Sequence, residues 1–164
     1  MITYLSKGQV VKLDKETSVE VLWPDRRTEL EYQNMNDETD ENDMSLIFKI
    51  NKDGHRILAT GDVDSACLDN LANEYGDYLD SEILKVAHHG SKYSESENFV
   101  QKVSPEYAVF QVGKNNFGHP NKGIVEKFRR VGIIIYRNDN DGAVAFDFGR
   151  NNKTKVRTVK GEKD

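Results

Sequence analysis

Cysteine, proline and long apolar runs are all scarce in this chain of 164 residues, and each scarcity excludes a class of protein. A single cysteine, Cys67, excludes an internal disulfide framework and any zinc site built from four cysteines. No apolar run exceeds four residues, as in Ile133–Tyr136, whereas a membrane-spanning helix needs about 18. The first residues lack a basic segment followed by an apolar one, so we expect no signal peptide. Length and composition alone therefore indicate one ordinary folded domain.

A strong excess of basic charge is also missing. The net charge is −5, and residues 25–43 hold eight acidic and two basic residues, which leaves 20 acidic and 21 basic residues elsewhere. The acidity thus belongs to residues 25–44, which we interpret as an acidic segment that is either an exposed loop or a disordered insertion. The balance elsewhere excludes a broad nucleic-acid-binding surface, although residues 151–164 form a locally basic C-terminal tail.

Apolar patterning predicts a strand-rich first part followed by alternating strands and helices. We expect strands at 10–13, 19–23, 45–50, 55–60, 83–87, 107–112, 133–136, 143–148 and 154–159. We expect helices over 64–75, from 94 to 103, and around 124–131. This order indicates an α/β domain over residues 1–150, in which helices cover a sheet.

Three polar clusters directly follow predicted strands, where α/β proteins place their functional loops. They contain Asp62, the pair His88-His89, and His119, and thus three of the four histidines of the chain. The fourth histidine, His55, opens a strand after a turn, and we expect it to be exposed.

Asp62 and the histidine pair each have a structural and a chemical interpretation. Asp62 precedes a predicted helix, but Asp64 is better placed as its N-cap, so metal ligation is the alternative for Asp62. His88 and His89 would point to opposite sides of a strand unless Gly90 lets the chain turn. They are therefore either metal ligands or hydrogen-bonded loop histidines.

His119 lies between Gly118 and Pro120, just before a predicted helix whose N-terminus would attract an anion. It either contacts a phosphate or a leaving-group oxygen, or it has only a role in the turn. Ser91 lacks the Gly-x-Ser-x-Gly surroundings of a nucleophile, so we expect no serine chemistry there.

Five short segments repeat the motifs of one family in the same order. They are Asn42–Phe48, Ala59–Asp62 (Thr-Gly-Asp), Ile83–Ser91 (Leu-Lys-Val-x-His-His-Gly-Ser), Val112–Pro120 (Val-Gly-x-Asn-x-x-Gly-His-Pro) and Asn138–Ala143. Together they resemble the metallo-β-lactamase superfamily, and within it the hydrolase domain of the ComEC family of late-competence DNA-uptake proteins. The resemblance implies an αββα sandwich with a two-metal hydrolytic site that holds zinc or manganese.

The same resemblance implies roles for the polar residues. Asp62 would bridge the two metals, and either His88 or His89 would be the last ligand. His119 would contact the phosphate of the substrate or help to protonate the leaving group. A metal-activated water, rather than Ser91, would attack DNA or another phosphodiester.

The chain departs from the family in one respect, because the first metal motif, His-x-His-x-Asp-His, is absent. Asp62, His88 and His89 are too few for two metals, since a catalytic zinc takes about three protein ligands plus water. We therefore expect the C-terminal half of the sandwich, with little or no activity until an N-terminal half completes it. One sheet covered on one side would leave an apolar face exposed, which also predicts a homodimer.

Two other hypotheses remain open from the sequence. The chain is alternatively a non-catalytic interaction module derived from this fold, or a phosphoesterase that acts on cell-wall polymers. The compartment is open as well: cytoplasmic for a stand-alone product, membrane-associated for a fragment of a ComEC-type protein.

Overall fold

The computed structural model describes residues 5–26, 28, 41–149 and 154–159. Most of the acidic loop predicted for residues 25–44, and much of the basic tail predicted for 151–164, lies outside these residues. Within the described ranges, no helix combines the length and the apolar composition that crossing a membrane requires.

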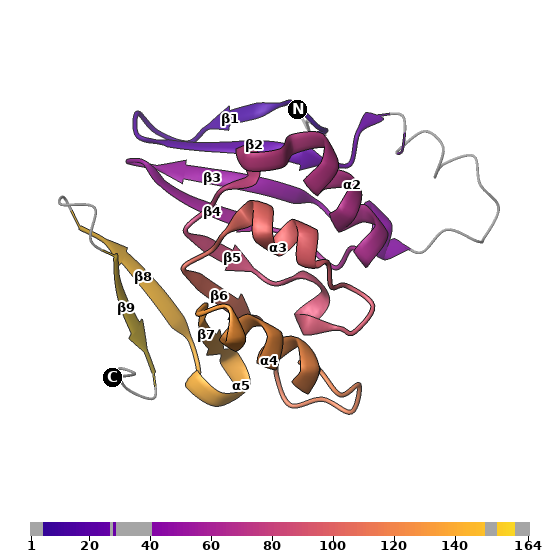
Figure 1. The fold of residues 1–164 in the computed structure, drawn as a ribbon. Coiled ribbons are helices and arrows are strands. Elements are labelled where there is room, and N and C mark those ends of the chain that lie inside the picture. Colours follow the sequence, from indigo (N-terminus) through magenta and orange to yellow (C-terminus); the bar gives the residue numbers. More distant parts are fainter. Residues whose placement is uncertain (1–4, 27, 29–40, 150–153, 160–164) are drawn as a thin grey trace.

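A seven-stranded mixed sheet forms the centre of the fold, with its strands in chain order (Figure 1). The strands are β1 (Val10–Lys12), β2 (Thr17–Trp23), β3 (Ile47–Lys52), β4 (His55–Ala59), β5 (Ile83–Lys85), β6 (Tyr107–Phe110) and β7 (Ile134–Arg137). Strands β1 to β4 pair antiparallel, and β4 to β7 pair parallel. The change occurs at β4 because each later connection crosses over through a helix.

Three helices supply these crossovers and lie together on one face of the sheet (Figure 1). They are α2 (Ser65–Tyr75), α3 (Glu97–Val103) and α4 (Lys122–Arg130), and short 3-10 helices occupy Glu41–Met44 (η1), Gly76–Leu79 (η2) and Ala87–Gly90 (η3). The N-cap side chains of the three helices are Asp64, Ser96 and Asn121, each of which accepts a backbone N–H of the first turn. Each helix thus begins where a short polar side chain can satisfy its first amides.

The main core lies between this face of the sheet and the helices. Leu58, Leu84, Ala108 and Ile135 share one register across the parallel strands and belong to the same buried cluster as residues of all three helices. The helix residues of that cluster are Cys67, Leu68, Leu71, Ala72, Phe99, Val103, Ile124, Val125 and Phe128. The fold is therefore mixed α/β, as the order of the predicted elements indicates.

A hairpin packs against the opposite face of the sheet. Helix α5 (Asn138–Asp141), where the sequence predicts only a turn, leads into strand β8 (Val144–Phe148), which pairs antiparallel with β9 (Thr154–Thr158). The ring of Phe146 lies 5.5 Å from that of Tyr107 and 6.2 Å from that of Tyr136. The face that we expected to be uncovered is thus partly covered by the chain itself, and the homodimer stays a prediction.

The prediction that His55 is exposed is wrong. Its residue surface is only 5% exposed, and its ring stacks on Phe148 with centroids 4.3 Å apart. Its Nδ1 lies 2.6 Å from Oε2 of Glu82. The reason is tertiary, because the β8–β9 hairpin, far away in sequence, covers the start of β4.

Candidate active site

The four candidate residues lie in the loops that follow three neighbouring parallel strands. Asp62 follows β4, His88 and His89 lie in η3 after β5, and His119 lies in the loop between β6 and α4. Because parallel strands end at the same edge of a sheet, these loops meet, as in other α/β proteins with functional sites at that edge.

Backbone hydrogen bonds fasten the three loops to one another. The N–H of His88 donates to the carbonyl oxygen of Gly61 at 3.0 Å, and the N–H of Asn121 donates to that of Gly90 at 2.9 Å. Gly90 has a φ of +81°, and a Cβ there would lie 2.6 Å from the ring of Phe110 and 2.8 Å from Pro120. Only glycine fits this close approach, so the histidine loop is held firmly between its neighbours.

The backbone of Asp62 is positioned by Ser45, which lies in the first of the five family-like segments. The N–H of Asp62 donates to Ser45 Oγ at 3.0 Å. The preceding residue, Gly61, has a φ of +53°, and a Cβ there would lie 2.4 Å from Cβ of Ser45. The Thr-Gly-Asp segment therefore needs its glycine to bring the aspartate against Ser45.

His89 points its ring at Asp62. Its Nδ1 lies 2.5 Å from the carbonyl oxygen of Gln111, and because a carbonyl oxygen only accepts, Nδ1 carries the hydrogen. In the neutral ring the lone pair is then on Nε2, which lies 3.4 Å from Oδ2 of Asp62. A histidine whose other nitrogen donates to a backbone carbonyl is the usual arrangement of a metal ligand.

The ring of His88 lies close to that of His119. Both histidines have left-handed backbone angles, with φ of +44° for His88 and +55° for His89, an uncommon conformation outside glycine. The ring of His88 lies 5.6 Å from that of His119 and 6.2 Å from that of His89.

Among the residues that the structure describes, no group of three or more histidine, cysteine, aspartate or glutamate side chains is arranged to hold a metal ion.

His119 is half-buried beside the histidine pair. Burial is the main reason that the pKa of His119 is below its usual value, and the neighbouring His88 and His89 lower it further. The carboxylate of Asp62 has the opposite, smaller effect. At neutral pH the ring is therefore an uncharged group with one hydrogen-bond donor and one acceptor.

Lys85 is a member of this cluster that sequence reasoning missed. Its Nζ donates to the carbonyl oxygen of Gly61 at 2.9 Å and lies 3.5 Å from Oδ1 of Asp62. Burial lowers the pKa of Lys85, and Asp62 opposes that shift. The sequence feature that could have indicated its role is a lysine within the short, mostly buried strand β5, because an unpaired charge there would be costly.

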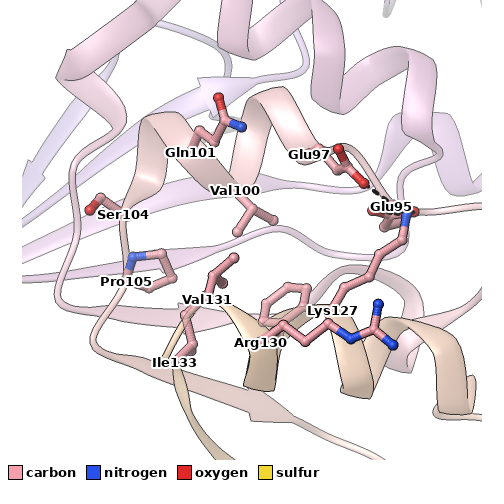
Figure 2. Close-up of a pocket in the computed structure, with 11 residues that line it drawn as sticks. Glu95, Glu97, Val100, Gln101, Ser104, Pro105, Lys127, Arg130, Val131 and Ile133 are labelled. Atoms are coloured by element: carbon pink, nitrogen blue, oxygen red, sulfur yellow. Dashed lines mark hydrogen bonds and ion pairs between the residues drawn. The ribbon is translucent and has the colours of Figure 1, made fainter.

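A groove of about 550 Å³ lies between α3 and α4, on the outer side of the helix layer (Figure 2). Figure 2 shows Lys127 extending to Glu95 and Glu97, and its Nζ lies 2.9 Å and 3.1 Å from their carboxylates. The four candidate residues do not line this groove. It is separate from the histidine loops.

Known proteins with similar sequences carry competence and recombination names. The chain is 38% identical to Competence protein ComA of Neisseria gonorrhoeae over 112 residues, which is 68% of this chain and 16% of that protein. It is 28% identical to ComE operon protein 3 of Bacillus subtilis over 148 residues, 90% of this chain and 18% of that protein. It is 27% identical to Recombination protein 2 of Haemophilus influenzae over 109 residues, 66% of this chain and 14% of that protein. The chain thus spans less than a fifth of the length of these relatives.

No family model matches the chain. Among solved structures, a putative metal-dependent hydrolase from Parabacteroides distasonis superposes with a TM-score of 0.50 at 13% identity, over 81% of this chain and 56% of that one. At that identity the likeness concerns the fold alone. The chain belongs to the ComA/ComEC family of competence proteins and matches one part of these longer relatives.

Proposed function

We propose that this chain contributes part of a metal-dependent phosphodiesterase site, of the nuclease type, that acts on DNA during uptake. The named relatives are competence and recombination proteins, and the solved structure of similar fold is named a putative metal-dependent hydrolase. These names concern those proteins, whereas Asp62 and His89 of this chain supply the evidence of its own.

The observation that carries the proposal is the orientation of His89 toward Asp62. The Nδ1 hydrogen of His89 is held by the carbonyl oxygen of Gln111, so Nε2 faces the carboxylate of Asp62 at 3.4 Å and, in the neutral ring, presents a lone pair to it. Two acceptors facing each other repel, whereas a cation between them would be bound by both.

The donor set fits a metal ion in part. Asp62 and His89 would hold it, and a bound zinc or manganese ion would stabilise the negative charge that develops on the phosphate oxygens. Two protein ligands are fewer than the roughly three that a catalytic zinc takes. We therefore propose that further ligands come from an N-terminal half of the same fold, and that the chain alone has little or no activity.

The remaining cluster residues would act on the substrate and on Asp62. His119, uncharged at neutral pH, would donate a hydrogen bond to a phosphate oxygen or to the leaving group. Lys85 is a positioning residue, because its Nζ links the carboxylate of Asp62 to the carbonyl oxygen of Gly61. The ammonium group keeps the aspartate oriented toward His89.

The experiment starts from the gene. The coding region next to Met1 is searched for a His-x-His-x-Asp-His segment, and the polypeptide carrying it is expressed together with this chain. We expect hydrolysis of a labelled DNA strand that needs Mn²⁺ or Zn²⁺ and is lost in Asp62→Asn. Asp64→Asn is the matched control, because asparagine also caps helices well and should leave hydrolysis unchanged. Absence of such a segment near the gene, or full hydrolysis by Asp62→Asn, would contradict the proposal.

A further inference from the structure

Phe117 is a large apolar side chain left in solvent beside the histidine cluster. It is 84% exposed, the highest value among the exposed large hydrophobic residues of the described chain. Its ring is nearly parallel to that of His119, with an angle of 22° and centroids 6.0 Å apart. The ring of His119 in turn lies 5.6 Å from that of His88, so a row of rings leads from the solvent to the histidine pair.

Hydrogen bonds from Asn115 hold the loop that exposes Phe117. Asn115 Oδ1 accepts the N–H of Phe117 at 3.0 Å and the N–H of His119 at 3.1 Å. Asn115 Nδ2 donates to the carbonyl oxygens of His119, at 2.8 Å, and Gly113, at 2.9 Å. One asparagine thus fixes the two rings relative to each other, and the loop presents a phenylalanine at a defined place.

Basic residues flank this segment in the sequence. Lys114 lies three residues before Phe117 and Lys122 three residues after His119, and both are exposed. Proteins bind single-stranded nucleic acid by combining exposed aromatic rings, on which bases stack, with basic side chains that attract the phosphates.

We propose that Phe117 is a base-stacking residue, on which one nucleobase of a single DNA strand rests while its phosphodiester reaches His119. This inference rests on the proposed function for the nature of the substrate. A base in a duplex is already stacked on its neighbours, so a single strand is the form that this ring selects. Phe117 would therefore determine which DNA the site accepts, apart from the metal chemistry.

The test measures binding of labelled 12-nucleotide strands to the metal-free chain by fluorescence anisotropy, in EDTA and low salt. The strands are oligothymidine, the same backbone with abasic residues, and a duplex. We expect the wild-type chain to bind the thymidine strand about tenfold more tightly than the abasic strand or the duplex. Phe117→Ala should remove that preference and leave abasic binding unchanged, whereas Phe117→Trp should keep it.

The controls separate stacking from loss of fold and from metal chemistry. Leu13→Ala removes another exposed apolar side chain, 65% exposed on the β1–β2 turn, and should keep the preference. Binding of Mn²⁺ should be the same in Phe117→Ala as in the wild-type chain, so a failure of the metal proposal is seen independently. Equal binding of thymidine and abasic strands by the wild-type chain, including no binding of either, would overturn the inference, as would an unchanged preference in Phe117→Ala.

Discussion

His89 Nε2 lies 3.4 Å from Oδ2 of Asp62, while Nδ1 of the same ring donates its hydrogen to the carbonyl oxygen of Gln111. This relationship links the loops after β4, β5 and β6 through one side chain. It exists because the His88-His89 segment turns with two successive left-handed residues, which the bonds to Gly61 and the packing of Gly90 maintain. The candidate site is therefore a property of all three loops together.

Gly61→Ala should destabilise the fold strongly. The new Cβ would lie 2.4 Å from Cβ of Ser45, at a φ that also disfavours side chains, so we expect a loss of about 2–5 kcal/mol in the free energy of unfolding. Gly132→Ala is the control, because its φ is also positive but no atom lies within 4 Å of the new Cβ. That variant should lose only about 1 kcal/mol in urea denaturation. Equal losses in the two variants would show that Ser45 does not constrain Gly61.

Phe146→Ala should loosen the β8–β9 hairpin while the helix side of the sheet keeps its structure. Phe146 contacts Tyr107 and Tyr136 and is half-buried, so its removal should cost about 2 kcal/mol. Hydrogen exchange should then speed up in β8, β9 and around His55, but not in α2 or α3. Asp147→Ala, on the solvent side of the same strand, should change exchange little, because exposed ion pairs such as Asp147–Arg157 contribute little. Unchanged exchange in Phe146→Ala would contradict the packing described for this face.

His119 should titrate below the usual histidine value of about 6.5 in an NMR pH titration. Because its folded pKa is lowered, the unfolded chain binds more protons between the folded and unfolded pKa values. The stability contribution of His119 is therefore complete above the unfolded pKa and is lost as the pH falls through the folded one. His88→Asn should raise the pKa of His119, because His88 lowers it. Asparagine is a suitable replacement, since it tolerates the positive φ of this position. A pKa of His119 above about 6.5 in the wild-type chain would contradict this prediction.

Cys67 should be unreactive in the folded chain. Burial raises the pKa of its thiol to about 12, and its residue surface is 8% exposed in the core between α2 and the sheet. The thiolate is the reactive form, so labelling with a disulfide reagent at pH 8 should occur only as the chain unfolds. Labelling rates should then rise in parallel with urea unfolding. Rapid, complete labelling without denaturant would show that this part of the core opens.

Local chemistry made several features predictable from the sequence. The Asp53-Gly54 turn between β3 and β4 and the Asp64 cap of α2 depend on residues within a few positions of each other. The four candidate site residues could be grouped from the sequence because they directly follow predicted strands, where α/β proteins place their functional loops. Local patterns are sufficient for contacts of this kind.

Long-range contacts account for what could not be predicted. His55 has the sequence context of an exposed turn residue, and it is buried only because Phe148 stacks on it from a hairpin far along the chain. Which histidine faces Asp62 depends on the left-handed turn at His88 and His89, and thus on bonds from other loops. The role of Lys85 follows from its distance to Asp62, which strand pairing decides.

Metal binding by the isolated chain tests the central claim most directly. In calorimetric titration with Zn²⁺ and with Mn²⁺, we expect weak binding that disappears in Asp62→Asn and in His89→Asn and persists in the matched control Asp64→Asn. Such a result fits a partial site that Asp62 and His89 form together. Tight binding of two metal ions by this chain alone, or binding that survives both substitutions, would contradict the account.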